Sequence, residues 1–206
     1  MADRLVPGMK FYLRIPTAGS ETWKVDVWTI DNYTNFELGE HTPAGNLVSQ
    51  VKYGGDAQRA QRAADQVAAM LADVGRVQSQ SPHTGRPSVF GIAGAVVAVP
   101  FFGDKALSLP HVLAAKAAGT LNLVDLSGLV SKTKATDPTK LQQKPVIDPS
   151  QFAANWTSKV RSVILVDDVY RSGVTLASLA LVLREAGVET VAALCAARAP
   201  SGMALR

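Results

Sequence analysis

Two adjacent acidic residues, Asp167 and Asp168, directly follow a run of four apolar residues in the stretch Val163–Thr175, VILVDDVYRSGVT. An apolar run of this kind is typical of a buried strand, so the two carboxylates are expected at its end. Neighbouring carboxylates repel each other unless a cation or a hydrogen-bond donor meets them. Carboxylates also accept hydrogen bonds from the vicinal hydroxyls of a sugar. The pair therefore indicates a site for a cationic or polyhydroxyl ligand.

The residues after the acids have the chemistry of an anion site. Parallel α/β sheets bind ligands at the carboxyl ends of their strands, and the segment from Tyr170 leads into an apolar, helix-like run that Thr175 is expected to cap. Free N–H groups and the helix dipole favour a phosphate there, and Gly173 lets the backbone approach it closely. Ser172 and Thr175 add hydroxyl groups. A sugar phosphate would satisfy both halves of the stretch.

The stretch closely resembles the 13-residue phosphoribosyl pyrophosphate (PRPP) signature of type I phosphoribosyltransferases. Both acids, the glycine and the final threonine match, while Arg171 and Ser172 replace two loop threonines. The resemblance implies that Asp167 and Asp168 are catalytic and hold the ribose hydroxyls, directly or through water on Mg²⁺, the expected cofactor. It implies a 5′-phosphate loop formed by Val169, Tyr170, Arg171, Ser172, Gly173, Val174 and Thr175. The alternatives are solvated acids at a strand end, or a metal site of the receiver or phosphatase type.

Other segments are similar, in the same order, to the competence-associated ComF-type relatives of these enzymes. The similarity covers roughly residues 47–199 and rests on VKYGGD with its following helix, VVAVPFF, SLPHVLAAKAAG and LVSKTKATDPTK. Two features depart from that type. The chain has no cysteine-rich zinc module, and it has ALSLPHV where an Arg-Gly-Phe-Asn-like run is common.

The resemblance also implies a pyrophosphate loop after the strand that ends at Pro100. It would contain Phe102, Gly103, Asp104 and Lys105. Gly103 permits close backbone approach, and Lys105 is a point charge suited to diphosphate oxygens. Taken alone, this segment is also compatible with an ordinary turn.

A lysine-rich segment at 131–144 matches the flexible loop that such enzymes close over the reaction. Lys132 and Lys134 are its first two lysines. Closure would exclude water and bring cations to the leaving pyrophosphate. A solvated linker is an equally acceptable interpretation, and the sequence does not single out one lysine.

The remaining pattern predicts a single α/β domain over residues 1–206. A hairpin is expected at 9–30, with residues 31–50 irregular, and together they would form a small β-rich N-terminal hood (1–50). The core (51–199) would be a mostly parallel sheet flanked by helices, the type I phosphoribosyltransferase fold, because strand, helix and strand follow one another at 160–198. Its other expected elements are a strand end at 51–53, a helix from the cap Asp56 to Gly75, a strand within 89–100, a helix from the cap Ser108 to Gly119, and one or two strands in 121–130.

Composition narrows the class of protein. The 206 residues have a net charge of +4, which mildly favours an anionic partner, and the single cysteine, Cys195, lies in an apolar run typical of a buried thiol. No signal peptide or spanning segment is recognisable, so we expect a cytoplasmic protein without membrane contact.

The predicted function is Mg²⁺-dependent transfer of phosphoribosyl to or from a nitrogenous base, a pentosyltransferase reaction with PRPP and a base or nucleotide as partners. A non-catalytic PRPP or nucleotide sensor is the first alternative. A ComF-like accessory role in DNA uptake or processing, with nucleic acid as partner, is the second. A homodimer is common among such relatives.

Overall fold

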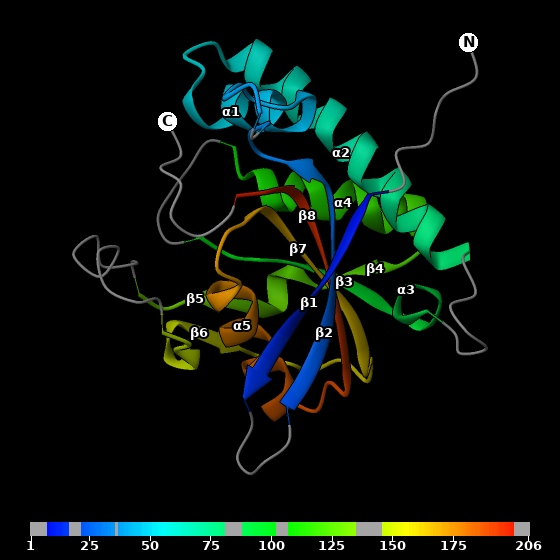
Figure 1. Ribbon diagram of the computed structural model, residues 1–206. Helices are drawn as coiled ribbons and strands as arrows, with labels where there is room; N and C mark the ends of the chain where they lie inside the picture. The colour runs from blue at the N-terminus through cyan, green and yellow to red at the C-terminus, as the bar shows by residue number, and fades with distance from the viewer. Residues whose placement is uncertain are drawn as a thin grey trace.

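The computed structural model describes residues 8–16, 22–35, 37–80, 88–101, 107–134 and 146–199. Six strands form the central sheet in the order β1-β2-β8-β7-β3-β4 (Figure 1). Their bounds are β1 Met9–Pro16, β2 Thr22–Asn32, β3 Ala95–Ala98, β4 Val124–Asp125, β7 Ser162–Tyr170 and β8 Thr190–Arg198. Only the β1–β2 pair is antiparallel among the sheet's described pairings. The predicted α/β class with a mostly parallel sheet is confirmed.

In the described parts of the chain, five helices and a second, small sheet surround the central sheet. The helices are α1 Pro43–Tyr53, α2 Ala57–Gln80, α3 Val89–Ile92, α4 Leu109–Leu121 and α5 Val174–Glu185. The small sheet pairs β5 Val130–Lys132 antiparallel with β6 Phe152–Ala154, and 3-10 turns lie at Ser127–Leu129 and Pro149–Gln151. Within the parts that the structure describes, no helix has the length and apolarity to cross a membrane.

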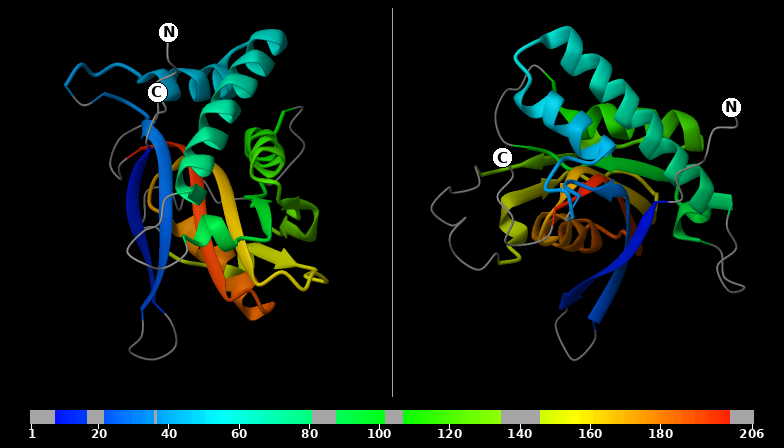
Figure 2. Two further views of the ribbon diagram at one scale, coloured as in Figure 1. Left: turned by 90° about the vertical axis from the view of Figure 1, so that its right-hand side faces the viewer. Right: turned by 45° about the horizontal axis from the view of Figure 1, so that its top comes forward.

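The sheet is covered on both faces, and β7 shows how its sequence permits this. Side chains alternate between the two faces of a strand. Ile164 and Val166 join the apolar cluster under α1, α2 and α4, while Val163 and Leu165 join the cluster under α5. Figure 2 shows α2 and α4 on one side of the sheet and α5 on the other. The continuous apolar run of β7 therefore reflects burial on both sides.

The chain order creates a topological switch point at the carboxyl edge of the sheet, between β3 and β7. From β3 the chain passes through α4 to β4, and from β7 it passes through α5 to β8, in the opposite direction along the sheet. The helices α4 and α5, which follow β3 and β7, cover opposite faces of the sheet. Ligands of open α/β sheets bind at such a switch point.

The predicted N-terminal hairpin is confirmed, and it continues the central sheet. β2 pairs in parallel with β8, with Thr29 opposite Cys195. Cys195 is fully buried, as expected for a structural thiol.

The expectation for residues 31–53 was wrong in two respects. Residues 43–53 form α1, where the sequence suggested an irregular segment followed by a strand end. Thr42 starts this helix, because its Oγ1 accepts a hydrogen bond from the Gly45 N–H at 3.1 Å. Gly54 ends it, and a Cβ at Gly54 would lie 2.4 Å from the Gln50 carbonyl oxygen.

Helix boundaries account for the other differences. The predicted cap Asp56 is confirmed, since its Oδ1 accepts from the Arg59 N–H at 2.9 Å. However, α2 passes through Gly75 to Gln80. A Cβ at Gly75 would lie 3.2 Å from the side chains of Leu121 and Leu194, so this glycine permits close packing and does not end the helix.

The helix α4 also runs further than expected. It ends at Asn122 in the left-handed conformation (φ 54°), beyond Gly119. Ser108 does precede the helix, but its Oγ pairs with His111 Nδ1 at 2.7 Å and makes no cap hydrogen bond.

Candidate functional site

The acidic pair lies at the carboxyl end of β7, beside the switch point. The strand extends past the acids to Tyr170, with Asp167 opposite Cys195 and Tyr170 opposite Arg198 in β8. Both acids are partly buried, and the Asp168 N–H donates to Asp167 Oδ1 at 2.8 Å. The sequence placed the pair at the correct edge of the sheet.

Asp167 has a strongly perturbed acidity. Burial, followed by the negative charge of Asp168, raises the pKa of Asp167 to about 8. The positive charges of Lys52 and Lys132 act in the opposite direction. Burial and the neighbouring charge therefore favour the protonated form of Asp167 in the free protein.

Lys52 is a site residue that the sequence analysis did not identify. Its Nζ lies 2.8 Å from Asp168 Oδ2. Burial alone would lower the pKa of Lys52, but its ion pair with Asp168 outweighs burial and the pKa is raised. The VKYGGD segment drew attention to this region, yet nothing in its pattern indicated a partner in a strand so distant in sequence.

The turn after β7 has the geometry expected of an anion-binding loop. Gly173 precedes α5 in the left-handed conformation (φ 75°), and a Cβ there would lie 2.7 Å from Leu13 Cδ1 and 2.8 Å from Tyr170 Oη. Ser172 Oγ accepts from the Val174 N–H at 3.5 Å. The first N–H groups of a helix have no acceptor within the helix, so the turn presents donors to an anion. The expectation that Thr175 caps the helix was wrong, because α5 begins at Val174 and Gly173 takes the cap position.

The loop side chains divide into supporting and exposed groups. The Tyr170 ring packs edge-on against Phe11 of β1, with 4.4 Å between the ring centroids. This contact anchors the start of the turn to the N-terminal hairpin. Val169 packs against the cluster under α1, α2 and α4. Arg171 and Thr175 are exposed to solvent.

The two predicted loop lysines have different surroundings. Lys132, at the end of β5, lies with its Nζ 5.9 Å from the centroid of the Phe152 ring. Burial lowers its pKa, and the charge of Asp167 opposes this, so Lys132 belongs to the surroundings of the acids. Lys134 Nζ instead donates to Ser150 Oγ at 3.3 Å.

Several predicted residues lie outside the described parts of the chain. These are Phe102, Gly103, Asp104 and Lys105 of the expected pyrophosphate loop, together with residues 135–145 of the lysine-rich segment.

Ser127 makes a polar contact with the end of β3 that the sequence did not indicate. Ser127 Oγ accepts from the Ala98 N–H at 2.8 Å and donates to Asp125 Oδ1 at 2.5 Å. It holds the last residue of β3, from which the expected pyrophosphate loop departs. No spacing in the sequence pointed to this contact.

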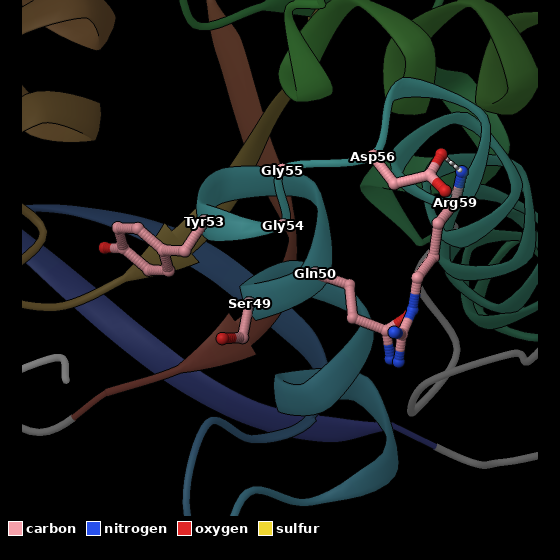
Figure 3. A pocket seen from close by; sticks show the side chains of 7 residues that line it. All are labelled: Ser49, Gln50, Tyr53, Gly54, Gly55, Asp56 and Arg59. Carbon is pink, nitrogen blue, oxygen red and sulfur yellow. Dashed lines mark hydrogen bonds between the residues drawn. The ribbon is translucent and has the colours of Figure 1, made fainter.

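A hollow of about 280 Å³ lies at the corner between α1 and α2, apart from the acids. It is lined by Ser49, Gln50, Tyr53, Gly54, Gly55, Asp56 and Arg59 (Figure 3). Arg59 Nε donates to Gln50 Oε1 at 3.1 Å, and Tyr53 lies on the side of the hollow away from Arg59 (Figure 3). Neither the acid pair nor the turn at Gly173 lines the hollow, so its chemistry differs from that of the candidate site.

The acids fit a role for Mg²⁺ that depends on a bound ligand. Among the described residues, no group of three or more histidine, cysteine, aspartate or glutamate side chains could hold a metal ion. Mg²⁺ usually keeps several waters and binds through one or two carboxylates together with substrate phosphates. The two acids beside the turn at Gly173 suit that arrangement.

The fold and the site together define an α/β protein with an acid pair and a glycine turn into a helix N-terminus at the switch point of its sheet. The chain belongs to the phosphoribosyl transferase domain family, whose model matches residues 65–205. The predicted family and the type I fold are therefore confirmed. No curated protein matches the chain. The family segment begins within α2, so β1, β2 and α1 lie outside it.

Proposed function

We propose that the protein is a phosphoribosyltransferase that binds PRPP with Mg²⁺ and transfers phosphoribosyl to or from a nitrogenous base. The observation that carries the proposal is the succession of the acid pair, the left-handed Gly173 and the start of α5 within a single strand-to-helix connection. Membership of the phosphoribosyl transferase domain family supports it.

In the proposed reaction, the acids and the turn hold the two ends of the ribose phosphate. Asp167 and Asp168 accept hydrogen bonds from the 2′- and 3′-hydroxyls, while the N–H groups around Gly173 bind the 5′-phosphate. The bond between the anomeric carbon and pyrophosphate breaks as a base nitrogen bonds to that carbon, and the base releases a proton. Pyrophosphate leaves as an anion, which Lys132 can help to stabilise from its position near Asp167. Most of the catalysis would come from orientation and charge stabilisation.

Mg²⁺ bound with PRPP would supply positive charge to the pyrophosphate. Asp167 and Asp168 are the residues proposed to hold it, directly or through water, because carboxylate oxygens and water are the ligands that this ion takes beside substrate phosphates.

The proposal is tested by calorimetric titration of PRPP with Mg²⁺ and by following pyrophosphate release with a panel of bases. We expect saturable PRPP binding and release with at least one base. Both should be lost in Asp167→Asn/Asp168→Asn and kept in Asp56→Asn, a control that alters an exposed acid whose side chain caps α2. Binding without release for any base would favour the sensor function. Failure of the wild type to bind PRPP would contradict the proposal.

We also propose that the chain belongs to the ComF-type subgroup. The order of the segments VKYGGD, VVAVPFF, SLPHVLAAKAAG and LVSKTKATDPTK along the chain supports this. A role in DNA handling would require single-strand binding that weakens with salt and with removal of the charges of Lys132 and Lys134. Binding that is independent of both would exclude that role.

A further inference from the structure

The segment that precedes the family domain contributes a charged side chain to the acid pair. Lys52 lies in the last turn of α1, outside residues 65–205. Its Nζ is 2.8 Å from Asp168 Oδ2, and the two side chains are only 23% and 19% exposed. This is a close, sheltered ion pair, which constrains both partners more than an exposed surface pair does.

The backbone that carries Lys52 is firmly positioned. Thr42 caps the start of α1, and Ala44 and Val48 are buried against the sheet. At Gly45 the helix approaches the Tyr33 carbonyl so closely that a Cβ would lie 1.9 Å from the carbonyl oxygen. The ammonium group of Lys52 is therefore presented to Asp168 from a helix whose N-terminal half is capped and packed in the core.

The contact leaves Asp168 able to bind a ligand. Lys52 engages Oδ2, and a carboxylate has about four lone-pair sites on its two oxygens. Within the described parts of the chain, the Asp168 carboxylate has no other hydrogen-bond or ion-pair partner. Oδ1 can therefore accept a hydrogen bond from a ligand hydroxyl while Oδ2 remains fixed.

Lys52 also offsets the negative charge of Asp168, which follows Asp167 directly in β7. The backbone N–H of Asp168 donates to Asp167 Oδ1, and neighbouring carboxylates repel each other. Because consecutive side chains of a strand leave opposite faces, each acid has a different lysine near it, Lys52 beside Asp168 and Lys132 near Asp167.

We propose that Lys52 is a positioning residue for the binding of the vicinal hydroxyls of a ribose 5-phosphate group. It orients Asp168 through Oδ2 and offsets its charge, so α1 is required for a complete site. This inference rests on the proposed function, because it assumes that the acids bind a ribose.

The test compares two phosphate monoesters, one with a sugar diol and one without. Ribose 5-phosphate has the hydroxyls, whereas methyl phosphate can occupy only the turn at Gly173. In Lys52→Met we expect ribose 5-phosphate and PRPP to bind about tenfold more weakly, the loss typical of one charge-assisted hydrogen bond. Methyl phosphate binding should be unchanged. Lys52→Arg, which keeps the charge, should restore most of the ribose 5-phosphate affinity.

Lys10→Met is the matched control. Lys10 Nζ also pairs with an aspartate, since it lies 2.8 Å from Asp26 Oδ2, and the two side chains are 25% and 29% exposed. This pair joins the edge strand β1 to β2 and does not involve the acid pair of β7. We expect the affinity for both monoesters to be unchanged in this variant. In an Asp168→Asn background, Lys52→Met should cause no further loss of ribose 5-phosphate binding, because its partner is already altered.

The possible outcomes separate the inference from the function on which it rests. If the wild type binds neither PRPP nor ribose 5-phosphate, the proposed function fails and the inference fails with it. If the wild type binds both and Lys52→Met binds them equally well, only the inference is overturned. Equal weakening for methyl phosphate would also overturn it, because Lys52 would then attract any anion. Loss of the folded state in both Lys52→Met and Lys52→Gln would also overturn it, because the ion pair would then be needed for folding.

Discussion

Replacing Asp167 with asparagine is expected to stabilise the free protein, and the gain should grow as the pH rises. The pKa of the Asp167 carboxyl is raised from 3.8 to about 8, chiefly by burial and then by Asp168. Between these values the folded state binds more protons than the unfolded state, so stability falls as pH rises through this window. Asparagine removes this cost and can still accept the Asp168 N–H.

The size of the effect follows from the two pKa values. Each tenfold difference in proton affinity corresponds to about 1.4 kcal/mol, so the interval from 3.8 to about 8 sets an upper bound of about 6 kcal/mol. Because Asp167 is only partly buried and its surroundings can relax, we expect a gain of about 2 kcal/mol at about pH 8.

Urea unfolding measured from about pH 4 to about pH 9, with a chelator present, provides the assay. The difference in unfolding free energy between Asp167→Asn and the wild type should increase up to about pH 8 and then level off. Asp56→Asn is the control, since a hydrogen bond from the Arg59 N–H lowers the pKa of Asp56 and it titrates below this window. A difference that is constant with pH, or a variant that is less stable throughout, would refute the reasoning.

Three further changes test other parts of the structure. Gly173→Ala would force a side chain into a left-handed backbone against close neighbours, so unfolding studies should show a loss of about 1–3 kcal/mol together with weaker ribose 5-phosphate binding. Gly187 also has a left-handed backbone (φ 98°), but no atom lies within 4 Å of the point where its Cβ would be. Gly187→Ala should therefore leave ribose 5-phosphate binding unchanged, and weaker binding in this variant would contradict a specific role for Gly173. Burial, followed by the charge of Asp167, raises the pKa of the Cys195 thiol. The thiol should therefore react with a disulfide reagent only after unfolding, and rapid reaction in the native protein would contradict its burial. Gly45→Ala should destabilise the protein by about 2–3 kcal/mol, because its Cβ would overlap the Tyr33 carbonyl, and an unchanged urea midpoint would contradict this packing.

The parts of the fold that the sequence predicted best are those specified by local pattern. The strand, turn and helix at 162–185 carry an apolar run, a glycine and a helical repeat in immediate succession. The same local consistency made the hairpin and the final strand predictable. The capping role of Gly173 was less evident, because Thr175 has the more usual cap chemistry and only the left-handed backbone of Gly173 decides between them.

The features that the sequence did not reveal depend on contacts between distant segments. Gly75 looked like a helix end, but it is a glycine because Leu121 and Leu194 pack against it. The start of α1 was hidden by the proline and glycine in its first turn, which interrupt the apolar pattern. Lys52 was missed for the same kind of reason, since its partner Asp168 is reached only once α1 has packed on the sheet.

The central claim is that the acids at the end of β7 and the turn at Gly173 form a PRPP site. Calorimetric titration of PRPP with Mg²⁺ into the wild type and into Asp167→Asn/Asp168→Asn tests this claim most directly. We predict saturable binding to the wild type and its loss in the double variant, with both proteins folded. Equal binding to the two proteins, or no binding to the wild type, would contradict the claim.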